Sequence, residues 1–236
     1  VNGELVDGPD VFIKGRSKQV HPELPEMTKG SQATDGGNLF LSVEERDELI
    51  AKYPAAEQFV KRFVGAEEFI NNKLRYCLWL KGVAPSQYRG IPPIMERLER
   101  VAEMRRKSPT KSVQKDADSP MLFTQIRQPE TPYMIIPRHS SENRRYIPFG
   151  YLSPDVICGD ANSMIPNASL VLFGTLMSSV HMAWMRVVCG RLKSDYRYSP
   201  SVYNNFPWPD KTTEAQKAKI EQTAQSILDA RALYPD

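Results

Sequence analysis

Three charged side chains near the end of the chain, Lys193, Asp195 and Arg197, alternate with uncharged residues. In an extended strand, side chains two positions apart project to one face, so these charges would form a single row. Four uncharged residues are predicted on the opposite face: Leu192, Ser194, Tyr196 and Tyr198. The charged row suits the DNA major groove, where guanine offers the N7 and O6 acceptors and cytosine offers an amino donor. Lys193 and Asp195 would then read one G·C pair, while Arg197 would bind a guanine or a phosphate.

The same pattern has a second interpretation that involves no ligand. A solvated strand with a neighbouring ion pair also alternates in this way, and such a pair contributes only about 0 to 1 kcal/mol. Two other basic clusters carry the same pair of interpretations, phosphate contact or simple solvation. One cluster is a loop with Arg138, His139, Arg144 and Arg145. The other is a basic stretch with Arg105, Arg106, Lys107, Lys111 and Lys115.

Signatures of common enzyme classes are missing from the sequence. It has no GxGxxG, GxxxxGK[ST], HExxH or GxSxG string, so the mechanisms tied to those loops have no visible scaffold. The histidines are scattered, and His181 stands in an apolar segment where a structural role is expected. Asn204 to Trp208 faintly resembles the loop with which amino-methyltransferases hold a flipped base. It lacks the adjacent prolines, so a hydrophobic junction is predicted there.

Composition and charge narrow the class of protein further. The 236 residues are 41% hydrophobic and 25% charged, enough to build one large or two small domains around a core. The formal net charge of +3 is too small to indicate nucleic acid by itself, so the local clusters carry that argument. Cys77, Cys158 and Cys189 are an odd number at wide spacing, which argues against a disulfide framework. With no membrane-length apolar run and no signal-peptide pattern, a cytoplasmic location is expected.

The elements expected to position these residues follow from periodicity and capping. Ser42 and Glu45 form a capping-box signature that opens a predicted helical pair over 43–64. The other expected elements are two strands within 69–80, a long helix from Pro92, a β meander over 121–165, a buried helix over 169–189 capped by Asn167 or Ser169, a strand after Gly190, and a last helix capped by Thr212 or Thr213. The last helix has a narrow stripe, Ile220, Ala224, Ile227 and Leu228, that needs a partner surface.

Three strings in this order resemble one family. They are MTKGSQATDGGNLFLS, GAEEFINNKLRYCLWL and PNASLVLFGTLMSSVHMAWMRVVCGRLKSDYRYSPSVYNNFPWP. Over residues 27–236 the chain resembles the target-recognition region of MmeI-like (type IIL) restriction-modification enzymes. These are single bacterial polypeptides that join an endonuclease, an adenine-N6 DNA methyltransferase and a DNA-reading domain. The resemblance implies a mixed α/β (α+β) fold with a central β region and flanking helices, like the domains of type I specificity subunits.

The resemblance also implies a division of labour. Residues 1–30 would be a linker or docking segment, 31–209 the DNA target-recognition domain, and 210–236 the start of a C-terminal helical region. The fragment itself would not be an enzyme and would hold no cofactor. S-adenosylmethionine, and magnesium for cleavage, would bind other parts of the parent chain. The expected partners are double-stranded DNA and the methyltransferase and nuclease domains of the same polypeptide, in the bacterial cytoplasm and without a membrane.

The family likeness assigns roles to particular residues. Lys193 and Asp195 align with a pair that specifies one base pair, and Arg197 with a residue that contributes to another. A second region implicated in base choice matches Asp160, Ala161 and Asn162. Further DNA contacts are predicted at Arg138, Arg144, Arg145, Arg191, Tyr198 and Ser199. The alternative function is a structural or protein-interaction domain without base readout.

Overall fold

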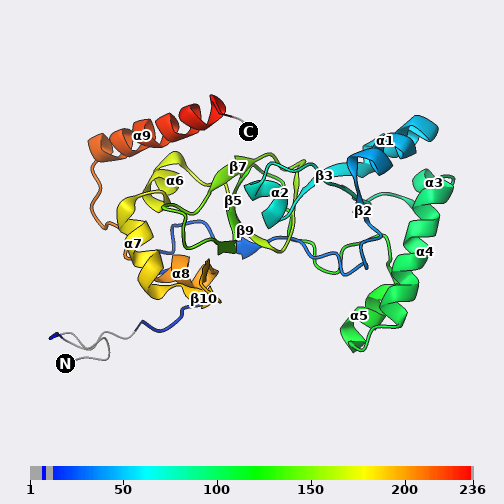
Figure 1. Cartoon of the computed structure of the whole chain (residues 1–236), viewed down its shortest axis with the longest axis horizontal. Helices are drawn as coiled ribbons and strands as arrows, with labels where there is room; N and C mark the ends of the chain where they lie inside the picture. Colours follow the sequence, from blue (N-terminus) through cyan, green and yellow to red (C-terminus); the bar gives the residue numbers. More distant parts are fainter. Residues whose placement is uncertain (1–6, 9–12, 235–236) are drawn as a thin grey trace.

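Three small sheets run along the length of the molecule (Figure 1). The structure is a computed structural model and describes residues 7–8 and 13–234. The central sheet has the order β1 (Thr28–Lys29), β9 (Asn162–Pro166), β5 (Tyr133–Pro137) and β7 (Gly150–Leu152). The second has the order β2 (Phe40–Leu41), β4 (Tyr76–Leu78), β3 (Val60–Val64) and β8 (Ile157–Cys158). The third has the order β10 (Gly190–Leu192), β11 (Asp195–Arg197) and β6 (His139–Ser140).

The second sheet belongs to one end of the molecule, which we call the α4 lobe. Its helices are α1 (Val43–Lys52), η1 (Pro54–Phe59), α2 (Ala66–Ile70), α3 (Pro85–Tyr88), α4 (Pro92–Arg106), α5 (Lys111–Lys115) and η2 (Asp116–Asp118). The predicted capping box is confirmed, because Ser42 accepts from the Glu45 amide and Glu45 from the Ser42 amide. One face of α4, with Ile94, Leu98 and Val101, packs into this lobe's core.

Two elements of the α4 lobe differ from the sequence prediction. The second helix of the predicted pair begins as η1, but residues 60–64 form strand β3, which pairs with β4 on one side and β8 on the other. The apolar spacing of 59–64 fits a helix and a strand buried on both sides almost equally well, and tertiary pairing decides between them. Conversely, Phe69 and Ile70 lie in the short helix α2 rather than in a strand. Their apolar run is short enough to be ambiguous in the same way.

The other end, which we call the hairpin lobe, carries the third sheet. Its helices are α6 (Leu170–Leu176), α7 (Ser179–Val188), α8 (Pro200–Asn205) and α9 (Glu214–Ala232). The single helix predicted over 169–189 is two helices, capped by Ser169 and Ser178. Among the described residues, no single helix has the length and apolar character of a membrane span. The α6–α7 pair reaches that length only with a 58° bend.

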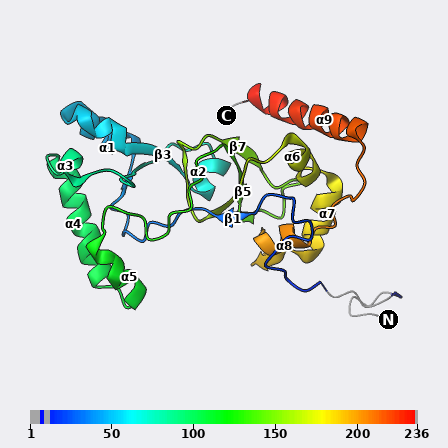
Figure 2. The same ribbon diagram turned by 180° about the vertical axis from the view of Figure 1, so that it is seen from behind.

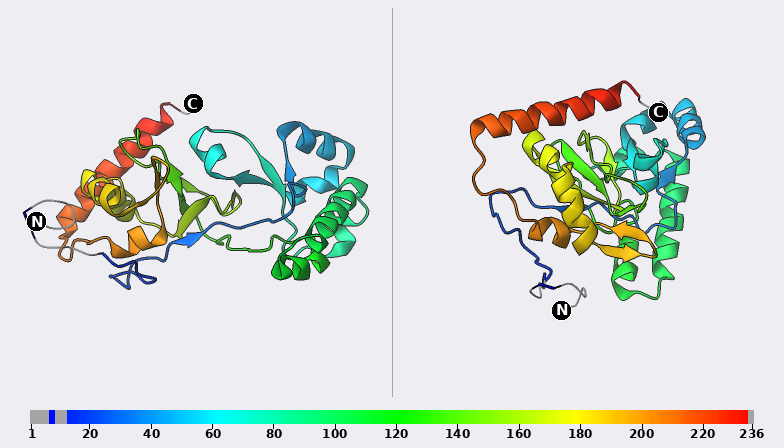
Figure 3. Two further views of the ribbon diagram at one scale, coloured as in Figure 1. Left: turned by 60° about the horizontal axis from the view of Figure 1, so that its bottom comes forward. Right: turned by 60° about the vertical axis from the view of Figure 1, so that its left-hand side comes forward.

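Helix α9 covers α6, as the predicted apolar stripe requires (Figure 3, right). Gly174 makes the close approach possible, because a Cβ atom there would lie 2.7 Å from Ile220 Cγ2 and 3.1 Å from Ala224 Cβ. Thr213 caps this helix, as predicted. Figures 2 and 3 show the chain around β1 running between the two lobes. The predicted mixed α/β class, with a central β region and flanking helices, is confirmed.

Candidate nucleic-acid interface

A β-hairpin stands where the sequence predicted one strand after Gly190. Strands β10 and β11 pair with Leu192 opposite Asp195, so Lys193 and Ser194 form a two-residue loop. The φ angle of Lys193 is 56°, in the left-handed region that residues other than glycine seldom occupy. The prediction that Lys193 shares a strand face with Asp195 and Arg197 was therefore wrong. Its exposed side chain stands on the turn instead.

The register of the third sheet divides its residues between two faces. Directly paired residues of antiparallel strands point to the same side, and Arg197 pairs with His139 while Tyr196 pairs with Ser140. The side with Tyr196 and Ser140 is buried. The outward side carries Leu192, Asp195, Arg197 and His139. The turn thus moves Leu192 to the charged face, opposite to the sequence prediction.

The inward face holds the hairpin in place. The guanidinium of Arg191 lies 4.4 Å from the Tyr196 ring centroid and donates to the Ser194 carbonyl at 2.8 Å. It also contacts Glu142 at 3.4 Å, whose backbone amide donates to Asp195 Oδ1 at 3.3 Å. Arg191 therefore stabilises the hairpin from the face opposite to Arg197. The prediction of Arg191 as a DNA contact has no support from this geometry.

A buried pair lies beneath the hairpin, directly after β11. His181 is fully buried and Tyr198 almost so, with Tyr198 Oη 2.9 Å from His181 Nε2. The Nδ1 atom lies 2.7 Å from the Leu176 carbonyl, which can only accept, so Nδ1 donates and Nε2 accepts from tyrosine. Burial lowers the pKa of His181 to about 4. The structural role predicted for His181 is confirmed. The expectation that Tyr198 faces DNA is corrected, because its side chain belongs to the core.

A second predicted region meets the hairpin sheet at β6. Arg138, the residue before β6, donates through Nη1 to the Asp160 carbonyl at 3.0 Å and through its amide to the Ala161 carbonyl at 3.1 Å. The structure thus brings three predicted DNA contacts together. Asn162 is different: it is fully buried, and its Nδ2 donates to the Val64 carbonyl at 3.0 Å. Its predicted role in base contact is corrected to one of support.

Electrostatics link the hairpin to Arg138. Burial lowers the pKa of His139, the cations of Arg138 and Arg197 lower it further, and Asp195 opposes them. The imidazole is therefore neutral near pH 7. We call this group of exposed and half-buried residues the hairpin surface. It comprises Arg138, His139, Asp160, Ala161, Leu192, Lys193, Asp195 and Arg197.

Other predicted basic residues lie elsewhere or have other partners. Arg144 and Arg145 are exposed in the loop between β6 and β7, where the Arg145 carbonyl accepts from Arg186 at 2.6 Å. Ser199 precedes α8, and its hydroxyl lies 2.8 Å from that of Ser201. Arg105 is fully buried, so the option of phosphate contact is wrong for it. Its five N–H donors reach the carbonyls of Ala33, Thr34, Asp116, Ser119 and Leu122.

A further basic residue, Arg127, lies beside the 159–161 part of the hairpin surface. The sequence does not mark Arg127 as part of a basic cluster, because its sequence neighbours are uncharged. Its amide donates to Ser31 Oγ at 2.9 Å and its Nη1 to the Gly30 carbonyl at 3.0 Å. Gly30 in turn abuts Gly159, since a Cβ atom at Gly30 would lie 2.2 Å from the Gly159 carbonyl oxygen. Only the folded contacts place Arg127 near the 159–161 loop.

Comparison with known proteins identifies the family. A family model described as "MmeI, target recognition domain" matches residues 7–210. The chain belongs to this family. It is 39% identical over 228 residues to DNA methyltransferase A of Bacillus subtilis (strain 168), which covers 96% of this chain and 26% of that protein. The solved structure of the type IIL restriction-modification enzyme MmeI in complex with DNA matches with a TM-score of 0.94 and 44% identity, over 100% of this chain and 31% of that one. The chain thus spans about a quarter to a third of these relatives.

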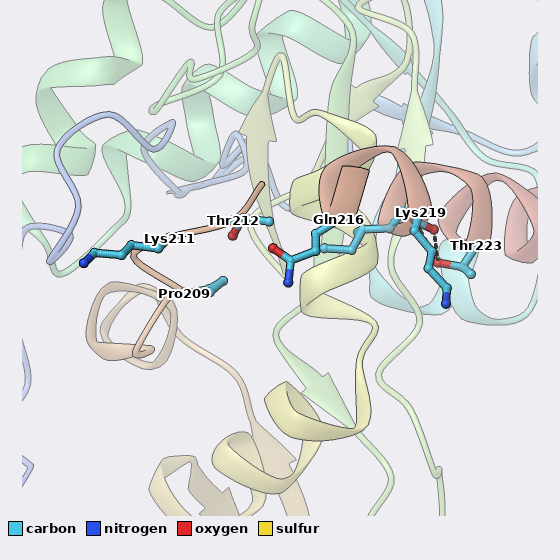
Figure 4. A pocket seen from close by; sticks show the side chains of 7 residues that line it. Pro209, Lys211, Thr212, Gln216, Lys219 and Thr223 are labelled. Atoms are coloured by element: carbon cyan, nitrogen blue, oxygen red, sulfur yellow. Dashed lines mark hydrogen bonds between the residues drawn. The ribbon is translucent and has the colours of Figure 1, made fainter. Parts of the chain in front are cut away.

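This target recognition domain also has a pocket away from the hairpin surface. About 460 Å³ lies between residues 209–212 and α9, lined by Pro209, Gln216 and Lys219 among others (Figure 4). In Figure 1, α9 lies on the opposite side of α6 and α7 from β10. Within the part of the chain that the structure describes, no three His, Cys, Asp or Glu side chains are grouped to hold a metal ion. The three cysteines are buried, and each is a free thiol.

Proposed function

We propose that this chain is the sequence-specific recognition module for double-stranded DNA of a bacterial restriction-modification methyltransferase. The observation that carries the proposal is the β10–β11 hairpin, whose outward face presents Asp195 and Arg197. The major groove of B-DNA is about 12 Å wide and admits a two-stranded β ribbon. Family membership and the likeness to a DNA-bound MmeI structure support the same function.

Within this module, different residues read the bases and contact the DNA backbone. We assign Lys193 on the turn and Asp195 on β11 to one G·C pair, with lysine at the guanine acceptors and the carboxylate at the cytosine amino group. Arg197 reads a neighbouring base. Exposed arginines of the flanking loop, Arg144 and Arg145, contact phosphates, which set register without carrying sequence information.

The catalytic parts belong to the rest of a longer polypeptide. DNA methyltransferase A is almost four times the length matched here, which leaves room for a methyltransferase domain that uses S-adenosylmethionine. That domain would flip and methylate an adenine at N6 while this module holds the duplex. An endonuclease domain would use magnesium. Residues 1–30 would link or dock to these domains, 31–209 would read DNA, and 210–236 would begin a helical region. All would act in the bacterial cytoplasm.

Methylation mapping of cellular DNA tests this proposal. The full-length protein is expressed as wild type and as the double variant Lys193→Glu, Asp195→Arg. We expect a methylated motif that changes at one base pair, toward the reversed C·G pair. A charge-swapped pair on α9, Glu214→Lys with Lys217→Glu, is the matched control and leaves the motif unchanged. An unchanged motif at normal activity in the Lys193, Asp195 variant would overturn the assignment of these two residues.

A protein-interaction or structural domain is the second candidate. The observation in its favour is a pair of exposed valines on α7, Val180 and Val187, at 69% and 83% exposure. Salt separates the two functions, because phosphate contacts make DNA affinity fall steeply with salt whereas apolar docking barely responds. Salt-insensitive binding to a protein, with no DNA binding at low salt, would favour the second candidate.

A further inference from the structure

The hairpin surface contains one large apolar side chain, Leu192. It is 57% exposed, and the register places it opposite Asp195 and on the same face as Arg197. Its neighbours on that face are charged or polar, apart from Gly190, which has no side chain. Leu192 therefore has no apolar surface of its own sheet to pack against.

An exposed leucine is unusual at this position of a sheet. Strand β10 is the edge of the order β10-β11-β6, so no described strand pairs with its outer side. Proteins usually protect such edges with charged side chains, because an exposed apolar edge favours aggregation. On the outward face the charged residues lie on β11, while the edge strand contributes Leu192 and directs its charged residue, Arg191, to the opposite side. The face is thus polar in the middle and apolar at its rim.

A pyrimidine methyl group is the apolar feature that this arrangement fits. In the major groove, base edges present hydrogen-bonding atoms together with the C5-methyl group of thymine. The polar residues of the face suit the former and Leu192 suits the latter. A protein partner would instead need an apolar patch, and the residues around Leu192 supply none.

We infer that Leu192 contacts the C5-methyl group of a pyrimidine next to the base pair read by Asp195. This inference rests on the proposed function and adds a fourth specificity-determining residue to the three charged ones. The pairing of Leu192 with Asp195 sets the position, because side chains of directly paired residues lie about 5 Å apart. The recognition motif therefore contains a thymine, or a 5-methylcytosine, beside that base pair.

Deoxyuridine substitution tests the contact, since deoxyuridine lacks only the methyl group. The full-length protein is titrated without magnesium against 30-bp duplexes that carry its mapped motif, with thymines in and beside the motif replaced one at a time. We expect one position at which the affinity falls about fourfold, the value of one buried methyl group. In a parallel series, 5-methylcytosine replaces each cytosine. A gain at one cytosine with no deoxyuridine effect identifies methylcytosine as the source of the methyl group.

Variants assign the effect to Leu192. Leu192→Ala binds the thymine duplex about fourfold more weakly and shows no further loss with deoxyuridine. Leu192→Asn, which keeps the side-chain length, gives the same result. Leu74→Ala removes a leucine of similar exposure, 53%, from the α4 lobe and keeps the deoxyuridine effect.

Three results distinguish failure of this inference from failure of the proposed function. A motif without any methyl-sensitive position overturns the contact, and so does a methyl effect of unchanged size in Leu192→Ala. Equal weakening of Leu192→Ala on thymine and deoxyuridine duplexes overturns it as well, since the leucine then supports folding or another domain. Absence of any methylated motif and of salt-dependent DNA binding overturns the proposed function itself.

Discussion

Two segments of this chain are both rich in Lys and Arg but have different structures. One surrounds the end of α4 and contains Arg105; the other spans 186–197 and contains Arg197. Arg105 is fully buried, and five backbone carbonyls accept its five N–H groups. Arg197 is exposed on the outward face of the hairpin. Because all five N–H groups of Arg105 donate to carbonyls inside the fold, this guanidinium has no donor left for a ligand.

The contrast shows why the number of basic residues in a segment does not locate an interface. Around α4 and α5, seven basic residues between 92 and 118 are opposed by five acidic ones. In the hairpin segment, four basic residues are opposed by Asp195 alone. The first segment is close to local neutrality and joins α4 to the loops around it. The second segment has the larger excess of positive charge, and two of its cations, Lys193 and Arg197, are exposed on the hairpin surface.

Replacing Arg105 should have the largest effect. In Arg105→Met the five carbonyls lose their donors inside the fold, and we expect the free energy of unfolding to fall by about 4 kcal/mol. Urea denaturation followed by tryptophan fluorescence measures this. Its exposed neighbour provides the control, because Arg106→Met should change the same quantity by less than about 0.5 kcal/mol. Similar losses in both variants would show that the carbonyl contacts do not distinguish the two arginines.

The sequence predicted elements where local signals and tertiary packing agree. The capping residues Ser42 and Thr213 and the apolar face of α4 are of this kind. It failed at β3, because pairing with β4 and β8 overrides a spacing that also fits a helix. The burial of Arg105 had no signal in the sequence either, since its acceptors come from segments as distant as Ala33.

The candidate site shows the same limit at finer scale. The charged residues of the hairpin were identified from alternation, but the turn was not, because Lys193 and Ser194 lack the Asn-Gly or Asp-Gly signature of such loops. Missing the turn placed Leu192 on the wrong face. Side chains that support the surface, such as Asn162 and Tyr198, were mistaken for contacts because sequence patterns do not report burial.

The buried histidine beneath the hairpin, His181, should give an effect of intermediate size. The pKa of His181 falls from 6.5 to about 4 on folding, so the unfolded chain binds a proton over this range and the folded protein does not. Its contribution is fully present above pH 6.5 and is lost as the pH falls toward 4. We expect a loss of about 3 kcal/mol, at about 1.4 kcal/mol for each pH unit.

Urea denaturation at pH 7 and pH 4 measures this contribution as a difference between two proteins. In His181→Gln the amide can still donate to the Leu176 carbonyl and accept from Tyr198, but it does not titrate. Wild type should therefore lose about 3 kcal/mol more than the variant between the two pH values. Equal losses in the two proteins would mean that His181 is protonated within the folded protein. The hairpin would then pack against a charged imidazole.

The smallest effect is expected at α5, and it is the sharpest test of the comparison. Lys111 and Lys115 are exposed, so the double variant Lys111→Ala, Lys115→Ala should change the free energy of unfolding by less than about 0.5 kcal/mol.

DNA affinity of the full-length protein is then measured against salt. Each phosphate contact adds about 0.9 to the slope of log K against log salt, so Arg144→Ala with Arg145→Ala should lower it by about 2. The α5 variant should leave it unchanged, because nearby carboxylates offset the local charge. A fall of about 2 in the slope of the α5 variant would mean that the DNA interface extends across both lobes. The two basic segments would then differ only in the burial of Arg105.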